Sequence, residues 1–243
     1  MSELSNYIDE YLKTEYTLKS TLKDSVQSSV YLYQKNDSAK QIVKIRQKNR
    51  NDHVLRRLRG QLNKNTATIY EVCSNDEDVT VLEEYISGAT LRHIVEANGG
   101  TLKRELAVKY ALDICNGLVF IHSLGIIHRD IKPSNIIITE QGEAVIIDFG
   151  IARLTDDSKY ADTKNLGTAG YAAPEQFGIY QSGPVTDIYA VGVLLNELLL
   201  GVHPTIDTPK GKLGKVINKC IMAQMSKRYQ NVSELAEVLN KLL

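Results

Sequence analysis

The stretch His128-Arg129-Asp130-Ile131-Lys132-Pro133-Ser134-Asn135 decides the fold, and thirteen residues after Asn135 comes Asp148-Phe149-Gly150. A third segment, Ala173-Pro174-Glu175, follows in the same order along the chain. Each short motif alone occurs by chance in unrelated proteins, and a lone Asp, Asn or Lys is usually a solvated surface residue. The order and the spacing together make the constellation specific.

This constellation resembles the catalytic half of eukaryotic-like (Hanks-type) protein serine/threonine kinases, in particular compact bacterial or phage members with a divergent N-lobe. The resemblance implies an α+β, bilobal protein kinase-like fold: a small antiparallel β-sheet N-lobe with one helix, and a mainly helical C-lobe. We expect one kinase domain over residues 1–243. Its N-lobe would cover about residues 14–85 and its C-lobe residues 86–243, with residues 1–13 as an N-terminal helical extension.

The resemblance also assigns catalytic roles. In-line transfer of a phosphoryl group needs metal to neutralise charge and a carboxylate to orient the attacking hydroxyl. Asp130 is the expected catalytic base, and Asn135 and Asp148 supply the oxygen ligands that Mg²⁺ prefers. Lys132 would contact the transferred phosphate, and its position is typical of serine/threonine kinases. The implied reaction moves the γ-phosphate of ATP to Ser or Thr hydroxyls of proteins, with ATP and Mg²⁺ as cofactors.

Other residues of the motifs are expected to support this site without taking part in the chemistry. By the same resemblance, Thr168 would hydrogen-bond toward Asp130 and Lys132. The buried Asp187 would steady the catalytic loop, and His128 would pack in the core.

A distant ion pair belongs to the same resemblance. Glu175 would pair with Arg228, which lies far along the chain. Removing one partner of such a buried pair costs about 3–5 kcal/mol.

On the nucleotide side, Ile42-Val43-Lys44 resembles the strand that carries the phosphate-contacting lysine, and residues 84–88 resemble the segment that meets adenine. Lys44 is therefore also a candidate catalytic residue. For the aliphatic side chains, plain core packing is an equal alternative. The expected cofactor-binding residues are Lys44, Val30, Ile42, Glu83, Glu84, Ile86 and Ile137.

The glycine-rich loop of the family is missing. No glycine occurs before Gly60, and Lys23, Ser25 and Ser28 stand where three glycines would be. Glycines let backbone N–H groups approach phosphates closely. The chain should therefore cover ATP less tightly, or use the serine hydroxyls and Lys23 instead, and its activity should be reduced.

The helix glutamate that normally pairs with the lysine is also missing, because its expected position falls on Leu55. We hypothesise that Glu83 replaces it and holds Lys44, since a buried carboxylate without a cation is costly. The alternative is that Glu83 points elsewhere or is protonated. Both departures favour a second function, a pseudokinase that signals or acts as a scaffold. A small-molecule kinase is disfavoured by Lys132 and by residues 167–175, which resemble peptide-handling parts.

Composition limits the remaining possibilities. Lys and Arg number 29, as do Asp and Glu, so no basic footprint for nucleic acid appears. Three widely spaced cysteines indicate neither a disulfide framework nor a zinc site. No signal peptide or membrane-spanning run is recognised, so we expect a cytoplasmic protein without membrane insertion. Its partners would be protein substrates, and a regulatory protein is left open, as is the oligomeric state.

The activation segment, between residues 151 and 166, offers several hydroxyls as phosphate acceptors, and Arg129 would receive such a phosphate. Ordinary solvation of a loop is an equal interpretation. The candidate acceptors are Thr155, Ser158, Tyr160 and Thr163.

Overall fold

The computed structural model describes the chain except for residues 1–2, 27, 49–51, 76, 157–166 and 178–180. The chain divides into two compact units. The first comprises Met1–Asn63 and Ala67–Ile86, and the second comprises Lys64–Thr66 and Ser87–Leu243.

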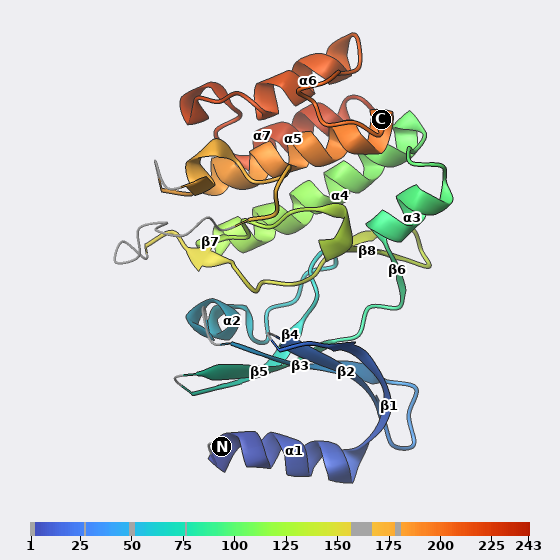
Figure 1. Ribbon diagram of the computed structural model, residues 1–243, viewed down its shortest axis with the longest axis vertical. Coiled ribbons are helices and arrows are strands. Elements are labelled where there is room, and N and C mark those ends of the chain that lie inside the picture. The colour runs from blue at the N-terminus through green and yellow to red at the C-terminus, as the bar shows by residue number, and fades with distance from the viewer. Residues whose placement is uncertain (1–2, 27, 49–51, 76, 157–166, 178–180) are drawn as a thin grey trace. The chain divides into compact units, whose positions relative to one another are not determined.

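The first unit is built on a five-stranded antiparallel sheet in the order β1-β2-β3-β5-β4 (Figure 1). The β-branched and aromatic runs at residues 29–34 and 41–45 form two adjacent antiparallel strands. The strands are β1 (Tyr16–Asp24), β2 (Ser28–Lys35), β3 (Gln41–Lys48), β4 (Ile69–Ser74) and β5 (Asp78–Glu84).

The register of the central strands decides which side chains share a face. Side chains alternate along a strand, and directly paired residues point to the same side. Val43 of β3 pairs with Glu83 of β5, whereas Lys44 pairs with Leu82. On the other flank of β3, Val30 of β2 pairs with Ile45. Val30, Val43 and Glu83 therefore lie on one face of the sheet, and Lys44 lies on the other.

The N-terminal helix α1 (Glu3–Glu15) covers the face that carries Lys44. Ile8 and Leu12, four residues apart, both point at the sheet and are 3% and 1% exposed. They join Ile42 and Leu82 in one apolar cluster. Burial of these side chains is what fixes α1 on the sheet.

The second helix of this unit is α2 (Asp52–Leu58), which Figure 1 shows on the opposite side of the sheet from α1. Val54, Leu55 and Leu58 follow a helical spacing and are buried in this helix. Arg59 leaves the helix to form a β-bridge with Ile69, and Gly60 adopts a φ of 74°. That left-handed conformation is open to glycine without a steric penalty.

The second unit is mainly helical. Its central helix α4 buries Ala107, Ile114 and Leu118 completely, because its apolar residues recur at helical spacing. Two small sheets pair β6, β8 and β9, and β7 with β10. The helices are α3 (Leu91–Ala97), α4 (Arg104–Ser123), α5 (Pro184–Leu200), α6 (Lys212–Cys220) and α7 (Val232–Asn240), with 3₁₀ turns η1 (Pro133–Asn135), η2 (Pro174–Phe177) and η3 (Met225–Lys227). The strands are β6 (Gly88–Thr90), β7 (Ile126–Ile127), β8 (Ile136–Thr139), β9 (Ala144–Ile146) and β10 (Arg153–Leu154).

A β-sheet unit with one helix on each side and a mainly helical unit confirm the predicted α+β, protein kinase-like fold class. Within the described part of the chain, no helix combines the length and the apolar character that crossing a membrane requires.

Candidate catalytic site

The Asp130 carboxylate lies at the centre of a hydrogen-bond network within the second unit. Lys132 Nζ donates to Oδ2 over 2.7 Å, and Asn135 Nδ2 donates to the same oxygen over 2.9 Å. The Thr168 hydroxyl donates to Oδ1 over 2.7 Å and accepts from Lys132 Nζ over 2.7 Å. The predicted bonds from Thr168 are confirmed. Three donors therefore surround this one carboxylate and fix its position.

The buried carboxylate of Asp187 accepts hydrogen bonds from the backbone of the catalytic loop. It accepts from the backbone N–H of His128 over 2.9 Å and of Arg129 over 2.8 Å, and His122 Nε2 lies 2.8 Å away. Burial alone would raise the pKa of Asp187, but these hydrogen bonds outweigh it and lower the pKa below its usual value. Arg129 has a φ of 66°, an uncommon left-handed conformation that the Asp187 contacts stabilise. The predicted steadying role of Asp187 is confirmed.

His128 is a packing residue, as predicted. Its side chain has no exposed surface, and its ring lies 5.2 Å from the ring of Phe149, centroid to centroid. Burial lowers the pKa of His128, so the ring is neutral near pH 7. A buried neutral ring in the core does not need a role in proton transfer.

Asp148 and Asn135 are the candidate metal ligands, and both belong to the second unit. Asp148 has a φ of 66° and an exposed side chain, and its Oδ1 accepts from the backbone N–H of Gly150 over 3.0 Å. Asn135 turns its amide nitrogen to Asp130, which leaves Oδ1 as an acceptor. Carboxylate and amide oxygens of this kind fit Mg²⁺, which is usually held by one or two protein oxygens together with substrate phosphate.

The predicted pair of Glu175 with Arg228 is confirmed. Arg228 Nη1 and Nη2 donate to the two carboxylate oxygens over 2.7 Å and 2.9 Å, and both side chains are buried. Thr186 adds a third donor to Glu175 at 2.8 Å. This bidentate ion pair links η2 to the segment before α7, so its role is structural and not catalytic.

Lys44 does not pair with Glu83, and the hypothesis that it does is wrong. The Lys44 ammonium group forms an ion pair with Asp9 of α1. Glu83 is 6% exposed and pairs with Val43, so its side chain points to the opposite face of the sheet. Alternation along β3 separates the two groups, and the amphipathic pattern of α1 gave no sign that Asp9 would be the partner.

The prediction that Val30 and Ile42 bind the nucleotide together also needs correction. Val30 and Ile42 lie on opposite faces of the sheet, and Ile42 is 2% exposed in the cluster beneath α1. They cannot contact the same ring. Ile137 is half-buried on β8 of the second unit, while Glu84 and Ile86 end the first unit. The adenine contacts of these three stay predictions.

In the turn between β1 and β2, a serine hydroxyl bonds within the turn. Ser25 Oγ donates to the carbonyl of Ser28 over 2.9 Å, and the N–H of Ser28 donates back over 3.1 Å. The Ser25 hydroxyl is thus engaged in closing the turn, and Lys23 is an exposed residue of β1. Use of these groups in place of glycines stays a prediction.

Most of the predicted phosphate acceptors cannot be placed. Ser158, Tyr160 and Thr163 lie outside the described residues. Thr155 is exposed, and its backbone N–H donates to the carbonyl of Gly125. Arg129 Nε donates to the carbonyl of Ile151 over 2.8 Å, so the expected phosphate-binding arginine contacts the start of this segment.

Comparison with known proteins agrees with this geometry. A family model described as a protein kinase domain matches residues 14–243. A probable serine/threonine-protein kinase of Clostridium acetobutylicum is 33% identical over an alignment of 207 residues, which covers 74% of this chain and 31% of the relative. The probable serine/threonine-protein kinase PknB of Bifidobacterium longum is 42% identical over 127 residues, 51% of this chain and 18% of that protein.

The chain therefore spans less than a third of the length of these curated relatives. The family match nevertheless covers nearly all of it, including every residue around Asp130. The chain belongs to the protein kinase family, and both relatives described above are named probable serine/threonine-protein kinases.

Proposed function

We propose that this protein transfers the γ-phosphate of ATP to serine and threonine hydroxyls of protein substrates. The observation that carries the proposal is the network in which Asp130 is held by Lys132, Asn135 and Thr168. These groups form one connected cluster within a single unit. Family membership alone would not supply that arrangement.

Asp130 is the proposed catalytic base. Its carboxylate would accept the hydrogen bond of the incoming hydroxyl and aim the hydroxyl oxygen at phosphorus. Lys132, 2.7 Å from the carboxylate, would place a positive charge where the transferred phosphoryl group passes. Thr168 bridges both groups and fixes their separation. Mg²⁺ held by Asn135 and Asp148 would neutralise phosphate charge when bound.

Lys44 would contact the phosphates only if its ion pair with Asp9 opened. Its motif assigns it to the phosphates, but its ammonium group is bound to Asp9 on the α1 face of the sheet. Contact with phosphate therefore requires this ion pair to open and the side chain to leave that face. Glu83 and Val30 share the opposite face and remain proposed nucleotide contacts.

The position of Lys44 favours one second candidate function. A pseudokinase would bind nucleotide weakly or not at all and would act through its shape. The pair with Asp9 is the observation that supports it, because it occupies the residue most needed for phosphate. The intact Asp130 network opposes it, since a scaffold has no physical need for such a site.

One experiment separates the two functions. Incubate the protein with Mg²⁺, radiolabelled ATP and a generic protein substrate, and compare Asp130→Asn with the native protein. We expect Asp130→Asn to lower the transfer rate by about 10²–10⁴-fold, the range of general-base catalysis. The matched control is Glu105→Gln, which removes an exposed carboxylate on α4. No transfer by the native protein, together with no thermal shift from ATP and Mg²⁺, would establish the pseudokinase.

A further inference from the structure

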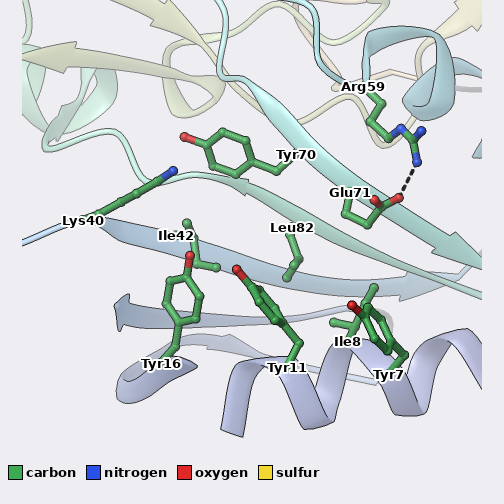
Figure 2. Close-up of a pocket in the computed structure, with 10 residues that line it drawn as sticks. All are labelled: Tyr7, Ile8, Tyr11, Tyr16, Lys40, Ile42, Arg59, Tyr70, Glu71 and Leu82. Carbon is green, nitrogen blue, oxygen red and sulfur yellow. Dashed lines mark hydrogen bonds and ion pairs between the residues drawn. The ribbon is translucent and has the colours of Figure 1, made fainter. Parts of the chain in front are cut away.

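A pocket of about 560 Å³ lies in the first unit, between α1 and the sheet (Figure 2). Its lining combines aliphatic side chains from the sheet and α1 with four tyrosines, and charged side chains stand at its ends. None of the catalytic residues of the second unit takes part. The volume is in the range of about 300–1,000 Å³ that is usual for small-molecule sites.

The interior of the pocket is apolar and aromatic. Ile42 and Leu82 form its base and are 2% and 5% exposed. Figure 2 shows the rings of Tyr11 and Tyr16 rising from α1 and the chain just after it toward these strands. Their centroids lie 5.7 Å apart, and Tyr70 of β4 closes the space from the other side. The Tyr11 and Tyr16 rings contact each other at an interplanar angle of 59°, so a flat ligand would lie against this pair and face Tyr70.

The two ends of the pocket differ in charge. At one end, Arg59 is neutralised by Glu71 over 2.7 Å. At the other, Lys40 Nζ lies 4.7 Å from the centre of the Tyr70 ring. No carboxylate of the described residues forms an ion pair with Lys40, although the charge of Glu84 acts on the same Tyr70 ring, so Lys40 is the one cation of the lining that forms no ion pair there. An anionic group of a ligand would be attracted to Lys40.

The tyrosine hydroxyls are neutral hydrogen-bond groups. Burial and a hydrogen bond with Tyr11 raise the pKa of Tyr16 to about 12, and burial and the charge of Glu84 raise the pKa of Tyr70. Both phenols are therefore protonated at neutral pH and carry no charge of their own.

We propose that this pocket binds a small aromatic carboxylate, with its ring between the tyrosines and its carboxylate at Lys40. A single cation suits one carboxylate and not the several charges of a nucleotide triphosphate. The tyrosine side chains would contact the aromatic ring of the ligand. Because Glu71 neutralises Arg59, only the Lys40 end would attract the carboxylate of the ligand. The proposal stands whether or not the protein transfers phosphate, because no catalytic residue lines the pocket.

Such a ligand would also bridge α1 and the sheet. Tyr11 and Ile8 come from α1, whereas Ile42, Leu82 and Tyr70 come from the strands, so a ligand between them contacts both. A ligand that binds the folded state stabilises it by mass action. Binding should therefore raise the melting temperature of the protein.

The test uses 2-naphthoate as the charged probe and 2-naphthamide as its neutral counterpart, titrated into the full chain by calorimetry. We expect one 2-naphthoate site, and an affinity about tenfold higher than for 2-naphthamide, as a charge-assisted contact supplies. Lys40→Ala should remove this tenfold preference. The control Lys19→Ala removes an exposed lysine of β1 outside the pocket and should leave it unchanged.

Three results would overturn the proposal. The first is no binding of 2-naphthoate at millimolar concentration. The second is an equal effect of Lys40→Ala and Lys19→Ala. The third is displacement of 2-naphthoate by ATP and Mg²⁺ combined with unchanged binding in Tyr11→Ala, which would place the probe in the nucleotide site. Urea unfolding of each variant verifies that it is folded.

Discussion

Asp130 and Lys44 are both charged residues of kinase motifs. The contacts of Asp130 are those that its motif implies, whereas the contact of Lys44 is not. Asp130 bonds to Lys132, Asn135 and Thr168, all of which its motif predicted nearby. Lys44 bonds to Asp9 and lies on the face opposite Glu83. A loop brings its own neighbours together, whereas a strand residue depends on register, and a shift of one position moves it to the other face.

The largest expected effect concerns the scaffold beneath Asp130. Arg228→Met should lower the free energy of unfolding by about 3–5 kcal/mol, because it leaves Glu175 buried and without its charged partner. Urea unfolding at pH 7 measures the change. Lys215→Met, an exposed position on α6, is the control and should shift stability by less than about 0.5 kcal/mol. A similar small shift for Arg228→Met would show that the pair is not needed to hold the second unit together.

The next effect compares two lysines in phosphoryl transfer. Lys132→Met should reduce the rate by about 10²–10³-fold, the cost of removing one group that stabilises developing charge. Lys44→Met should leave the rate nearly unchanged, because the Lys44 ammonium group is bound to Asp9 and not to the phosphate. Initial rates with a generic protein substrate measure both. Equal losses would show that Lys44 leaves Asp9 and reaches the phosphate.

A smaller effect should appear in the pH dependence of stability. Burial lowers the pKa of His128 in the folded protein, so below the unfolded value of about 6.5 the unfolded chain binds an extra proton. Stability from this residue is complete above pH 6.5 and is lost as pH falls, with a slope of up to about 1.4 kcal/mol per pH unit.

Urea unfolding between pH 7 and pH 5 tests this sign. His128→Leu should flatten the pH dependence, although it also changes the packing against Phe149. His93→Gln on the exposed surface of α3 is the control and should keep the slope of the native protein. An unchanged slope in His128→Leu would mean that another group titrates in this range.

The sequence was most informative where its signals were local. The apolar spacing of α4, the hairpin of β2 and β3, and the contacts of Thr168, Asp187 and Arg228 all followed from patterns or motifs. The strand β1 and the short helices α3 and α6 were not predicted, since their patterns are short or, as in β1, mostly exposed.

The nucleotide-side residues were less predictable for a physical reason. Motif position named Lys44, Val30 and Ile42, but only the pairing of β2, β3 and β5 determines which of them share a face. Packing of the helix α1 also determines the partner of Lys44, because burial of Ile8 and Leu12 brings Asp9 to Lys44. Neither register nor docking of a helix can be read from spacing alone.

The smallest expected effect tests that docking directly. Asp9→Asn should lower the free energy of unfolding by roughly 0.2–1 kcal/mol, since it removes a part-exposed ion pair while Ile8 and Leu12 still bury their side chains. The loss should be largest at low ionic strength and should shrink toward zero in 1 M salt, where such pairs are screened. Glu10→Gln, the neighbouring exposed carboxylate of α1, is the matched control and should show little change at either salt concentration. If the two variants behave alike, Asp9 does not hold Lys44 in solution, and the lysine is free to take the role that its motif assigns.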